Sequence, residues 1–332
     1  MSPPSLNQLL KQTSRSFYLT LRVLPRAVRP QIGLAYLLAR TTDTIADTEI
    51  VPVAKRLQAL QQLRDRILGS QDLGLDFTAL AQEQGLPAER LLLERCDASL
   101  ALLRALAPAD RKHVRSVLVT IISGQSLDLQ RFADATAGGV FALSNEAELD
   151  DYTYRVAGCV GEFWTQMCRA HLFPDANLDE GRLIAEGIRF GKGLQLVNIL
   201  RDLPADLRKG RCYLPADKLA AVNLLPADLL APASEVKLRP LYDRYLDFAE
   251  AYLAAGWSYT NTIPRRQVRV RLGCAWPILI GLETIKRLRA NSVLDPNGRS
   301  KISRPDVRRI LFRSVLRYPC ANAWRRLAPF PA

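Results

Sequence analysis

The amino-acid sequence predicts an all-α protein, and three observations support this expectation. Apolar residues recur at the three- and four-residue spacing of helices along most of the chain. We find no alternation of apolar and polar residues of the kind that marks half-buried strands. The 332 residues are 48% hydrophobic and 24% charged, which suits a large globular core. A single domain over residues 1–332 is expected, with residues 1–13 as a loose lead-in.

Four segments in the first part of the chain have the periodicity of amphipathic helices. They cover residues 30–48, 52–68, 89–106 and 111–129. Pro25 and Pro30 precede the first of them, and residues 69–76 form the expected loop between the second and third.

Five more helices are expected in the second part. They cover residues 149–172, 179–203, 236–262 and 268–288, followed by a basic helix from Pro305. Small residues at Ala157, Gly158 and Gly161 predict a place where two helix backbones approach closely.

The end of the helix predicted over 179–203 is the most informative stretch. Gln195, Asn198, Asp202 and Asp206 follow each other at offsets that place them within an arc of about 80°, provided that the helix continues past Pro204. Pro204 is expected to end or distort the helix there. Amides and carboxylates are costly to bury beside apolar residues, so this stripe is expected to bind something.

The helix predicted over 30–48 repeats this pattern. Tyr36, Arg40, Asp43 and Asp47 cluster within about 60° on one face. Two carboxylates one turn apart repel each other unless a cation lies between them. Magnesium prefers oxygen ligands and bridges carboxylates to substrate phosphates. The first hypothesis is therefore a magnesium and phosphate site, with basic residues at 208, 209 and 211 near the anion.

The formal net charge of +13 suits an anionic partner, which includes nucleic acid, phosphorylated substrates and an acidic membrane surface. The basic C-terminal helix lacks the interleaved aromatics of a nucleic-acid-binding module, so no nucleic-acid partner is expected. Six scattered cysteines and only two histidines argue against a zinc site. Residues 187–193 lack the spacing and the preceding strand of a phosphate loop. Without a visible signal or membrane-spanning run, a cytoplasmic protein is expected.

Several motifs together are highly specific. They are Ser14-Arg15-Ser16-Phe17, Tyr36-x-x-x-Arg40-x-x-Asp43-x-x-x-Asp47, Tyr152-x-x-x-Val156-Ala157-Gly158, Gln195-x-x-Asn198-Ile-x-Arg201-Asp202-x-x-x-Asp206 and Gly210-Arg211-x-Tyr213-x-Pro215. In this order and spacing, from residue 14 to about 215, the chain resembles the squalene/phytoene synthases.

The resemblance implies an all-α isoprenoid synthase fold and a head-to-head condensation of two prenyl diphosphates. It implies these metal ligands: Asp43, Asp47, Asn198, Asp202 and Asp206. It implies these diphosphate contacts: Ser14, Arg15, Arg40, Arg201 and Arg211. Gln195 and Asn198 would lie between metal and substrate, Tyr152 would assist proton removal, and Tyr36 and Phe17 would line the cavity.

The product follows from a finer resemblance. Cys274-Ala-Trp-Pro277 and the Lys301-Ile302 pair look like squalene synthases, which implies farnesyl diphosphate as substrate and reduction by NADPH, with Lys301 near the cofactor. Phytoene, dehydrosqualene and hydroxysqualene synthases are the alternatives within the family, and a catalytically silent helical scaffold is the alternative outside it. The chain lacks the C-terminal anchor of eukaryotic squalene synthases, so peripheral association with the inner face of the membrane is expected. The oligomeric state stays open.

Overall fold

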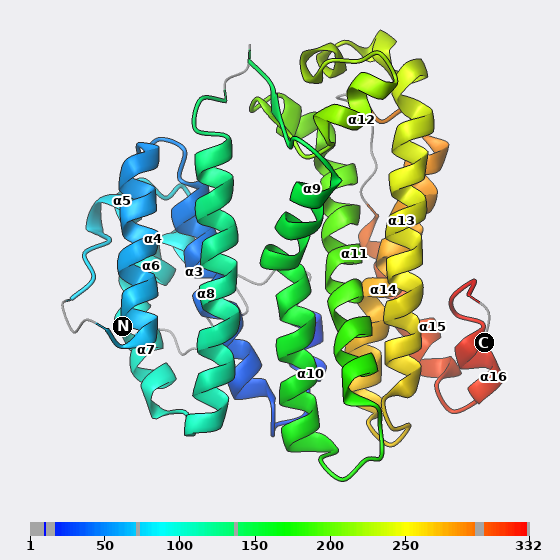
Figure 1. The fold of residues 1–332 in the computed structure, drawn as a ribbon. Helices are drawn as coiled ribbons and strands as arrows, with labels where there is room; N and C mark the ends of the chain where they lie inside the picture. Colours follow the sequence, from blue (N-terminus) through cyan, green and yellow to red (C-terminus); the bar gives the residue numbers. More distant parts are fainter. Residues whose placement is uncertain (1–9, 11–16, 71–73, 136–138, 296–301, 331–332) are drawn as a thin grey trace. The chain divides into compact units, whose positions relative to one another are not determined.

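The structure is a computed structural model. It describes residue 10 and residues 17–70, 74–135, 139–295 and 302–330, with the backbone alone at 17–19. Helices make up most of it and strands almost none, which confirms the predicted all-α class (Figure 1). The residues group into two compact units, one formed by Met1–Gln130 with Phe163–Asp175 and the other by Arg131–Glu162 with Ala176–Ala332. A single domain over the whole chain stays a prediction.

The first unit is built around α3, which contacts α2, α4, α6 and α7. Its helices are α2 (Phe17–Val23), α3 (Arg29–Asp47), α4 (Val53–Leu68), α5 (Thr78–Gln82), α6 (Pro87–Glu94), α7 (Cys96–Ala105) and most of α8 (Pro108–Arg131), with the later part of α10 (Cys159–Leu172). Buried threonines on α3 donate to carbonyls one turn back, Thr41 to Leu37 at 2.9 Å and Thr44 to Arg40 at 2.9 Å. Because these hydroxyls have hydrogen-bond partners within the helix, the side of α3 that carries the threonines can be buried.

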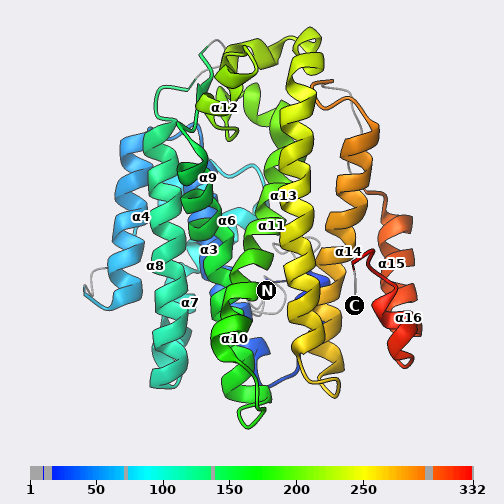
Figure 2. The same cartoon turned by 45° about the vertical axis from the view of Figure 1, so that its right-hand side comes forward.

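The second unit is organised by α11, α13 and α14, which run side by side (Figures 1 and 2). Its helical elements are α9 (Glu146–Thr153), the π-helical turn η1 (Tyr154–Gly158), the start of α10, α11 (Glu180–Leu207), α12 (Ala216–Ala221), the 3₁₀ turns η2 (Pro226–Leu230) and η3 (Pro232–Ser234), α13 (Glu235–Thr262), α14 (Val268–Ala290), α15 (Arg304–Arg317) and α16 (Ala321–Arg325). Two short strands, β1 (Phe141–Ala142) and β2 (Arg211–Cys212), pair in parallel.

The predicted small-residue patch brings two backbones into contact. A Cβ atom added to Gly161 would lie 1.9 Å from the carbonyl oxygen of Gly187, and one added to Gly191 would lie 2.3 Å from that of Ala157. Both distances are far below van der Waals contact. Glycine is therefore required at both positions where α11 meets η1 and the start of α10.

Three predicted segments differ in detail. The segment expected as one helix over 89–106 is two helices, α6 and α7, because the backbone at Arg95 leaves the helical region. Both helices bury one apolar face, so the periodicity continues across the break and hides it. The segment over 149–172 contains the π-helical turn, and the helix predicted to end near 203 continues to Leu207. The five-residue helix α5 was not predicted.

Within the described residues, no helix has both the length and the apolar character needed to cross a bilayer.

All six cysteines are free thiols, and only Cys320 is exposed. Burial raises the pKa of the Cys96, Cys159 and Cys212 thiols to about 12, so these side chains stay protonated and act as apolar core residues.

Candidate active site

The first acidic face lies on α3. Arg40 and Asp43 are half-buried and Asp47 is exposed, while the neighbouring Leu37, Leu38 and Ile45 are buried. Arg40 Nη1 lies 3.7 Å from Asp43 Oδ2. The helix thus presents its arginine and two carboxylates on one accessible side, as the spacing predicts.

The pKa of Asp43 is strongly perturbed. Loss of solvent around the carboxyl and repulsion from Asp47 raise its pKa to about 6, against the opposing effects of Arg40 and of a hydrogen bond from the Gln125 amide. The Asp43 side chain nevertheless keeps 46% of its accessible surface, so a solute can reach it. A carboxylate that is crowded by another and still reachable is suited to bind a cation.

Two carboxylates lie at the Arg40 guanidinium, and one of its N–H groups has no acceptor among the described residues. Its Nη2 donates to Glu89 Oε1 at 2.6 Å, and its Nη1 lies 3.7 Å from the Asp43 carboxyl. Its buried Nε has no hydrogen-bond acceptor among the described residues. A buried donor without an acceptor is costly, and an anionic ligand at this face would supply one.

The second acidic face lies on α11. Gln195, Asn198, Asp202 and Asp206 are all partly exposed, as the predicted stripe requires. The residues between them pack into the core of the second unit: Leu196, Val197, Ile199, Leu200 and Leu203. The four polar side chains therefore share one accessible face of a continuous helix.

Pro204 does not end α11. Proline has no N–H to donate to the carbonyl oxygen of Leu200, four residues earlier. The hydroxyl of Tyr242 on α13 donates to that oxygen at 2.9 Å, and the Tyr242 side chain is fully buried. The expectation of a helix end at Pro204 is wrong, because a neighbouring helix supplies the missing donor and Asp206 stays on the same helix as Asp202.

Asp202 is paired with the arginine that precedes it, Arg201. Arg201 donates to both oxygens of Asp202, from Nε at 2.9 Å and from Nη2 at 2.5 Å. Arg211, the other predicted diphosphate contact of this unit, lies in β2 directly after Gly210. Gly210 has a φ of +75°, a backbone conformation that favours glycine, and it turns the chain from α11 into the strand.

Tyr152 lies at the end of α9, directly before the π-helical turn. Its ring stacks on that of Tyr213, with centroids 4.7 Å apart and planes at 22°. Phe132 meets Tyr213 edge-on at 5.4 Å. This arrangement fixes the Tyr152 ring within an aromatic cluster, and π-helical turns are frequent at functional sites.

The remaining predicted residues are placed only in part. Tyr36 lies one turn before Arg40 on α3 and is half-buried. Ser14, Arg15 and Lys301 lie outside the described residues, and of Phe17 only the backbone, at the start of α2, is described.

Three residues that position this machinery were not predicted: Gln125, Glu89 and Tyr242. Gln125 had a signal in the sequence, since it is an amide within the apolar periodicity of the helix predicted over 111–129. The contacts of Glu89 and Tyr242 join residues 49 and 42 positions apart, and no local pattern marks them.

The donor set on both faces suits a hard cation. All candidate ligands are oxygens, from two carboxylates on α3 and from two carboxylates and an amide on α11. Among the described residues no three histidine, cysteine or acidic side chains gather as a metal-binding group. Magnesium commonly binds one or two carboxylates and takes its other ligands from water and substrate phosphates, so each pair fits that ion.

Comparisons with known proteins agree with these motifs. A family model described as squalene/phytoene synthase matches residues 10–306. A presqualene diphosphate synthase from Rhodopseudomonas palustris is 31% identical over 254 residues, which cover 76% of this chain and 77% of that protein. A phytoene synthase from Arthrospira platensis is 29% identical, covering 70% of this chain and 67% of its own. A solved complex of TcSQS with the ligand E5700 has the same fold, with a TM-score of 0.75, 20% identity and coverage of 93% and 84%.

Proposed function

Because the chain belongs to the squalene/phytoene synthase family, we propose that it is a squalene synthase acting on farnesyl diphosphate. Enzymes of this family condense two prenyl diphosphates head to head. In the proposed reaction two farnesyl diphosphates are joined through the cyclopropyl intermediate presqualene diphosphate, which is then reduced and rearranged to squalene. The observation that carries the proposal is the repeated acidic face: Arg40 with Asp43 and Asp47 on α3, and Arg201 with Asp202 and Asp206 on α11.

We assign magnesium to these faces. Asp43 and Asp47 would hold it on α3, and Asp202, Asp206 and Asn198 on α11. When bound, the metal offsets the negative charge that develops on a departing diphosphate. In the proposal each face binds a substrate diphosphate through its metal.

The chain's own cations bind the substrate anion. Arg40 offers the buried Nε that lacks an acceptor among the described residues, and Arg201 and Arg211 flank the second acidic face. Guanidinium groups recognise diphosphate oxygens with paired hydrogen bonds. Gln195 is assigned to the space between metal and substrate, and Ser14 and Arg15 to the diphosphate.

The chemistry also needs a proton acceptor and a dry, cation-tolerant surface. We propose that the Tyr152 hydroxyl assists the removal of the proton that is lost when the cyclopropane closes. The stacked rings of Tyr152 and Tyr213 offer aromatic faces to a carbocation. Tyr36 and Phe17 are assigned to the lining of the substrate cavity, where apolar surroundings would keep water from the cation.

The reductive step is the part of the proposal that depends on NADPH. It rests on the likeness of Cys274-Ala-Trp-Pro277 to squalene synthases, and Cys274 lies buried in α14. Lys301, the proposed contact for NADPH, is outside the described residues. The relative named presqualene diphosphate synthase favours a second candidate, in which the enzyme releases the cyclopropyl intermediate.

One product analysis separates these candidates. The purified protein is incubated with farnesyl or geranylgeranyl diphosphate and Mg²⁺, with and without NADPH, and the products are identified by mass spectrometry. Squalene that forms only with NADPH is the expected result. Presqualene diphosphate in both arms would establish the second candidate. A C40 product would refute the farnesyl assignment, and no product from either substrate would favour a silent scaffold.

A hydrocarbon product also has a consequence for location. Squalene carries no polar group, so it partitions into lipid rather than water. We therefore propose that the enzyme works as a peripheral protein at the inner face of the cytoplasmic membrane.

A further inference from the structure

The outward side of α15 carries large apolar side chains in contact with solvent. Phe312, Val315 and Leu316 are 69%, 52% and 67% exposed. They fall on one side of the helix, because residues 312, 315 and 316 lie within about 100° of each other around its axis. Apolar side chains clustered in this way mark an interaction surface more often than isolated ones do.

Arginines surround these apolar side chains. Arg304, Arg308 and Arg309 are exposed on α15, and Arg309 pairs with Asp306 at 2.8 Å. From residue 302 to the last residue of the sequence there are seven arginines and a single acidic residue, Asp306. This short stretch therefore accounts for a large part of the formal charge of +13.

The orientation of α15 is fixed by its opposite side. Ser314 is fully buried and accepts a hydrogen bond of 2.9 Å from Trp276 Nε1 on α14. Asp306, in the first turn of α15, accepts a hydrogen bond of 2.6 Å from Arg287, which lies on α14. Because these contacts hold one side of α15 against α14, the apolar and basic side chains opposite Ser314 are held outward.

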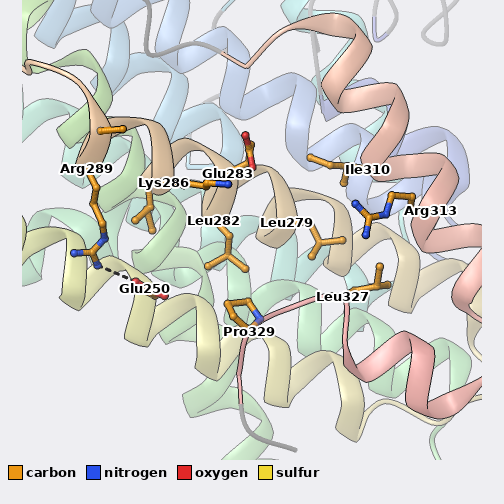
Figure 3. Close-up of a pocket in the computed structure, with 12 residues that line it drawn as sticks. Glu250, Leu279, Leu282, Glu283, Lys286, Arg289, Ile310, Arg313, Leu327 and Pro329 are labelled. Carbon is orange, nitrogen blue, oxygen red and sulfur yellow. Dashed lines mark hydrogen bonds and ion pairs between the residues drawn. The ribbon is translucent and has the colours of Figure 1, made fainter.

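A groove adjoins this helix. It has a volume of about 610 Å³ and lies between α14, α15 and the C-terminal segment (Figure 3). Its apolar walls include Leu279, Leu282 and Ile310. Its charged lining residues have both signs, with Lys286 and Arg313 beside Glu250 and Glu283, so the excess of cations is found on α15 itself.

We propose that the α15 face, formed by Arg304, Arg308, Arg309, Phe312, Val315 and Leu316, docks this protein onto an anionic lipid bilayer. Amphipathic helices bind in this way, with apolar side chains at the acyl boundary and arginines among the headgroups. The charge complements the negative surface of a bilayer that contains anionic phospholipid. This inference rests on the proposed function, which supplies the reason for a peripheral location at the membrane. The binding to lipid itself needs neither substrate nor turnover.

Vesicle sedimentation without substrate tests the proposal. The full chain should bind vesicles of phosphatidylglycerol and phosphatidylcholine, bind phosphatidylcholine alone far more weakly, and dissociate as salt rises. Arg304→Gln with Arg308→Gln should weaken binding to the anionic vesicles about 30-fold, since each cation near the surface contributes about 1 kcal/mol. Phe312→Ser with Leu316→Ser should weaken it on both kinds of vesicle.

The matched control lies on another helix. Val236 is 82% exposed on α13 beside the exposed Lys237, so Val236→Ser with Lys237→Gln removes one apolar side chain and one charge elsewhere on the surface. This control should bind as the unaltered protein does. Equal binding by the α15 variants and the control, or no preference for anionic vesicles, would overturn the proposal.

Cys320 offers a direct readout of docking. It lies three residues after α15 and is the one exposed cysteine of the chain. An environment-sensitive fluorophore on Cys320 should shift to the blue on binding anionic vesicles, and the shift should disappear in Phe312→Ser with Leu316→Ser. A label that stays in water while the protein sediments would contradict docking through this face. Preferential binding of a DNA duplex over the vesicles would overturn a lipid partner.

Discussion

The hydroxyl of Tyr242 on α13 donates a hydrogen bond of 2.9 Å to the carbonyl oxygen of Leu200, the oxygen that Pro204 leaves without its helical donor. Two residues after Pro204 on α11 lies Asp206, the last carboxylate of the second acidic face. A contact from a different helix therefore supports the turn that carries a proposed metal ligand.

Replacing Tyr242 by phenylalanine should destabilise the protein. The change leaves the buried Leu200 carbonyl without this donor, which costs about 1–3 kcal/mol in the free energy of unfolding. In a Pro204→Ala background the same change should cost less, because the introduced alanine supplies the N–H. Urea unfolding of the two single variants and the double variant measures the difference. An equal cost in both backgrounds would show that Tyr242 acts in another way, and Tyr245→Phe is the control from the same helix.

The pH dependence of stability should report on Asp43. Its pKa is raised from 3.8 to about 6 on folding, so the folded protein binds more protons than the unfolded chain between these values. Stability from this group therefore falls as pH rises through that window, and the loss is complete above about pH 6.

Asp43→Asn should remove this loss. With the metal chelated, the variant should be more stable than the unaltered protein at pH 7 by about 1 kcal/mol, an amount reduced by solvent screening because the side chain is 46% exposed. The difference should vanish below pH 4. Denaturant unfolding at both pH values measures it, with the exposed Asp175→Asn as control. A variant less stable at pH 7 would contradict the cause assigned to the shift.

Neutral substitutions in the acidic faces should abolish turnover. Asp43→Asn and Asp202→Asn keep the side-chain shape but remove a charge expected to bind metal, so kcat should fall at least a hundredfold. Product formation from farnesyl diphosphate measures this, and circular dichroism checks the fold. Asp175→Asn should keep its activity. Near-normal turnover in Asp43→Asn or Asp202→Asn would show that the substituted aspartate is not part of the active site.

The Tyr152 hydroxyl should matter for turnover more than for folding. Tyr152→Phe keeps the ring that stacks on Tyr213, so the free energy of unfolding should change by less than about 1 kcal/mol. If the hydroxyl moves a proton, kcat should fall by about 10²–10⁴. Steady-state kinetics and thermal melts separate the two effects, with Tyr318→Phe as a control. An unchanged kcat would show that Tyr152 contributes only to packing in the core.

Gly161 should be intolerant of the smallest side chain. The Cβ of Gly161→Ala would meet the Gly187 carbonyl at 1.9 Å, so the helices must separate, at a cost of about 1–3 kcal/mol or more. Gly85→Ala, whose Cβ would meet nothing within 4 Å, should be nearly neutral. The melting temperatures of the two variants provide the comparison, and similar values would contradict the close approach of the backbones.

Local periodicity predicted most of the helices, because each must bury an apolar stripe. The α3 segment was expected from Pro30 to Thr48 and is found over Arg29–Asp47. The same periodicity could not show the break at Arg95, since α6 and α7 bury similar faces on either side of it. The rule that proline ends a helix failed at Pro204, because it considers the chain alone and not the hydroxyl that Tyr242 supplies.

The acidic faces were predictable for a similar reason. Asp43 and Asp47, and likewise Asp202 and Asp206, are four residues apart, and a helix places such residues on one side. Their surroundings were not predictable. The Gln125 amide at Asp43 and the Glu89 carboxylate at Arg40 come from other helices, so only the folded chain shows them.

The paired hydrogen bonds from Arg201 to Asp202 make the two acidic faces unequal before any ligand arrives. Asp202 already holds a counterion that the chain provides, so a metal that binds there must exchange with a guanidinium. Asp43 has its arginine at 3.7 Å and meets a cation without such an exchange. Displacement would free the Arg201 guanidinium at the same moment, beside the ion and ready for an anion. If this face binds magnesium as proposed, metal binding there would be linked to the availability of a group that can bind phosphate.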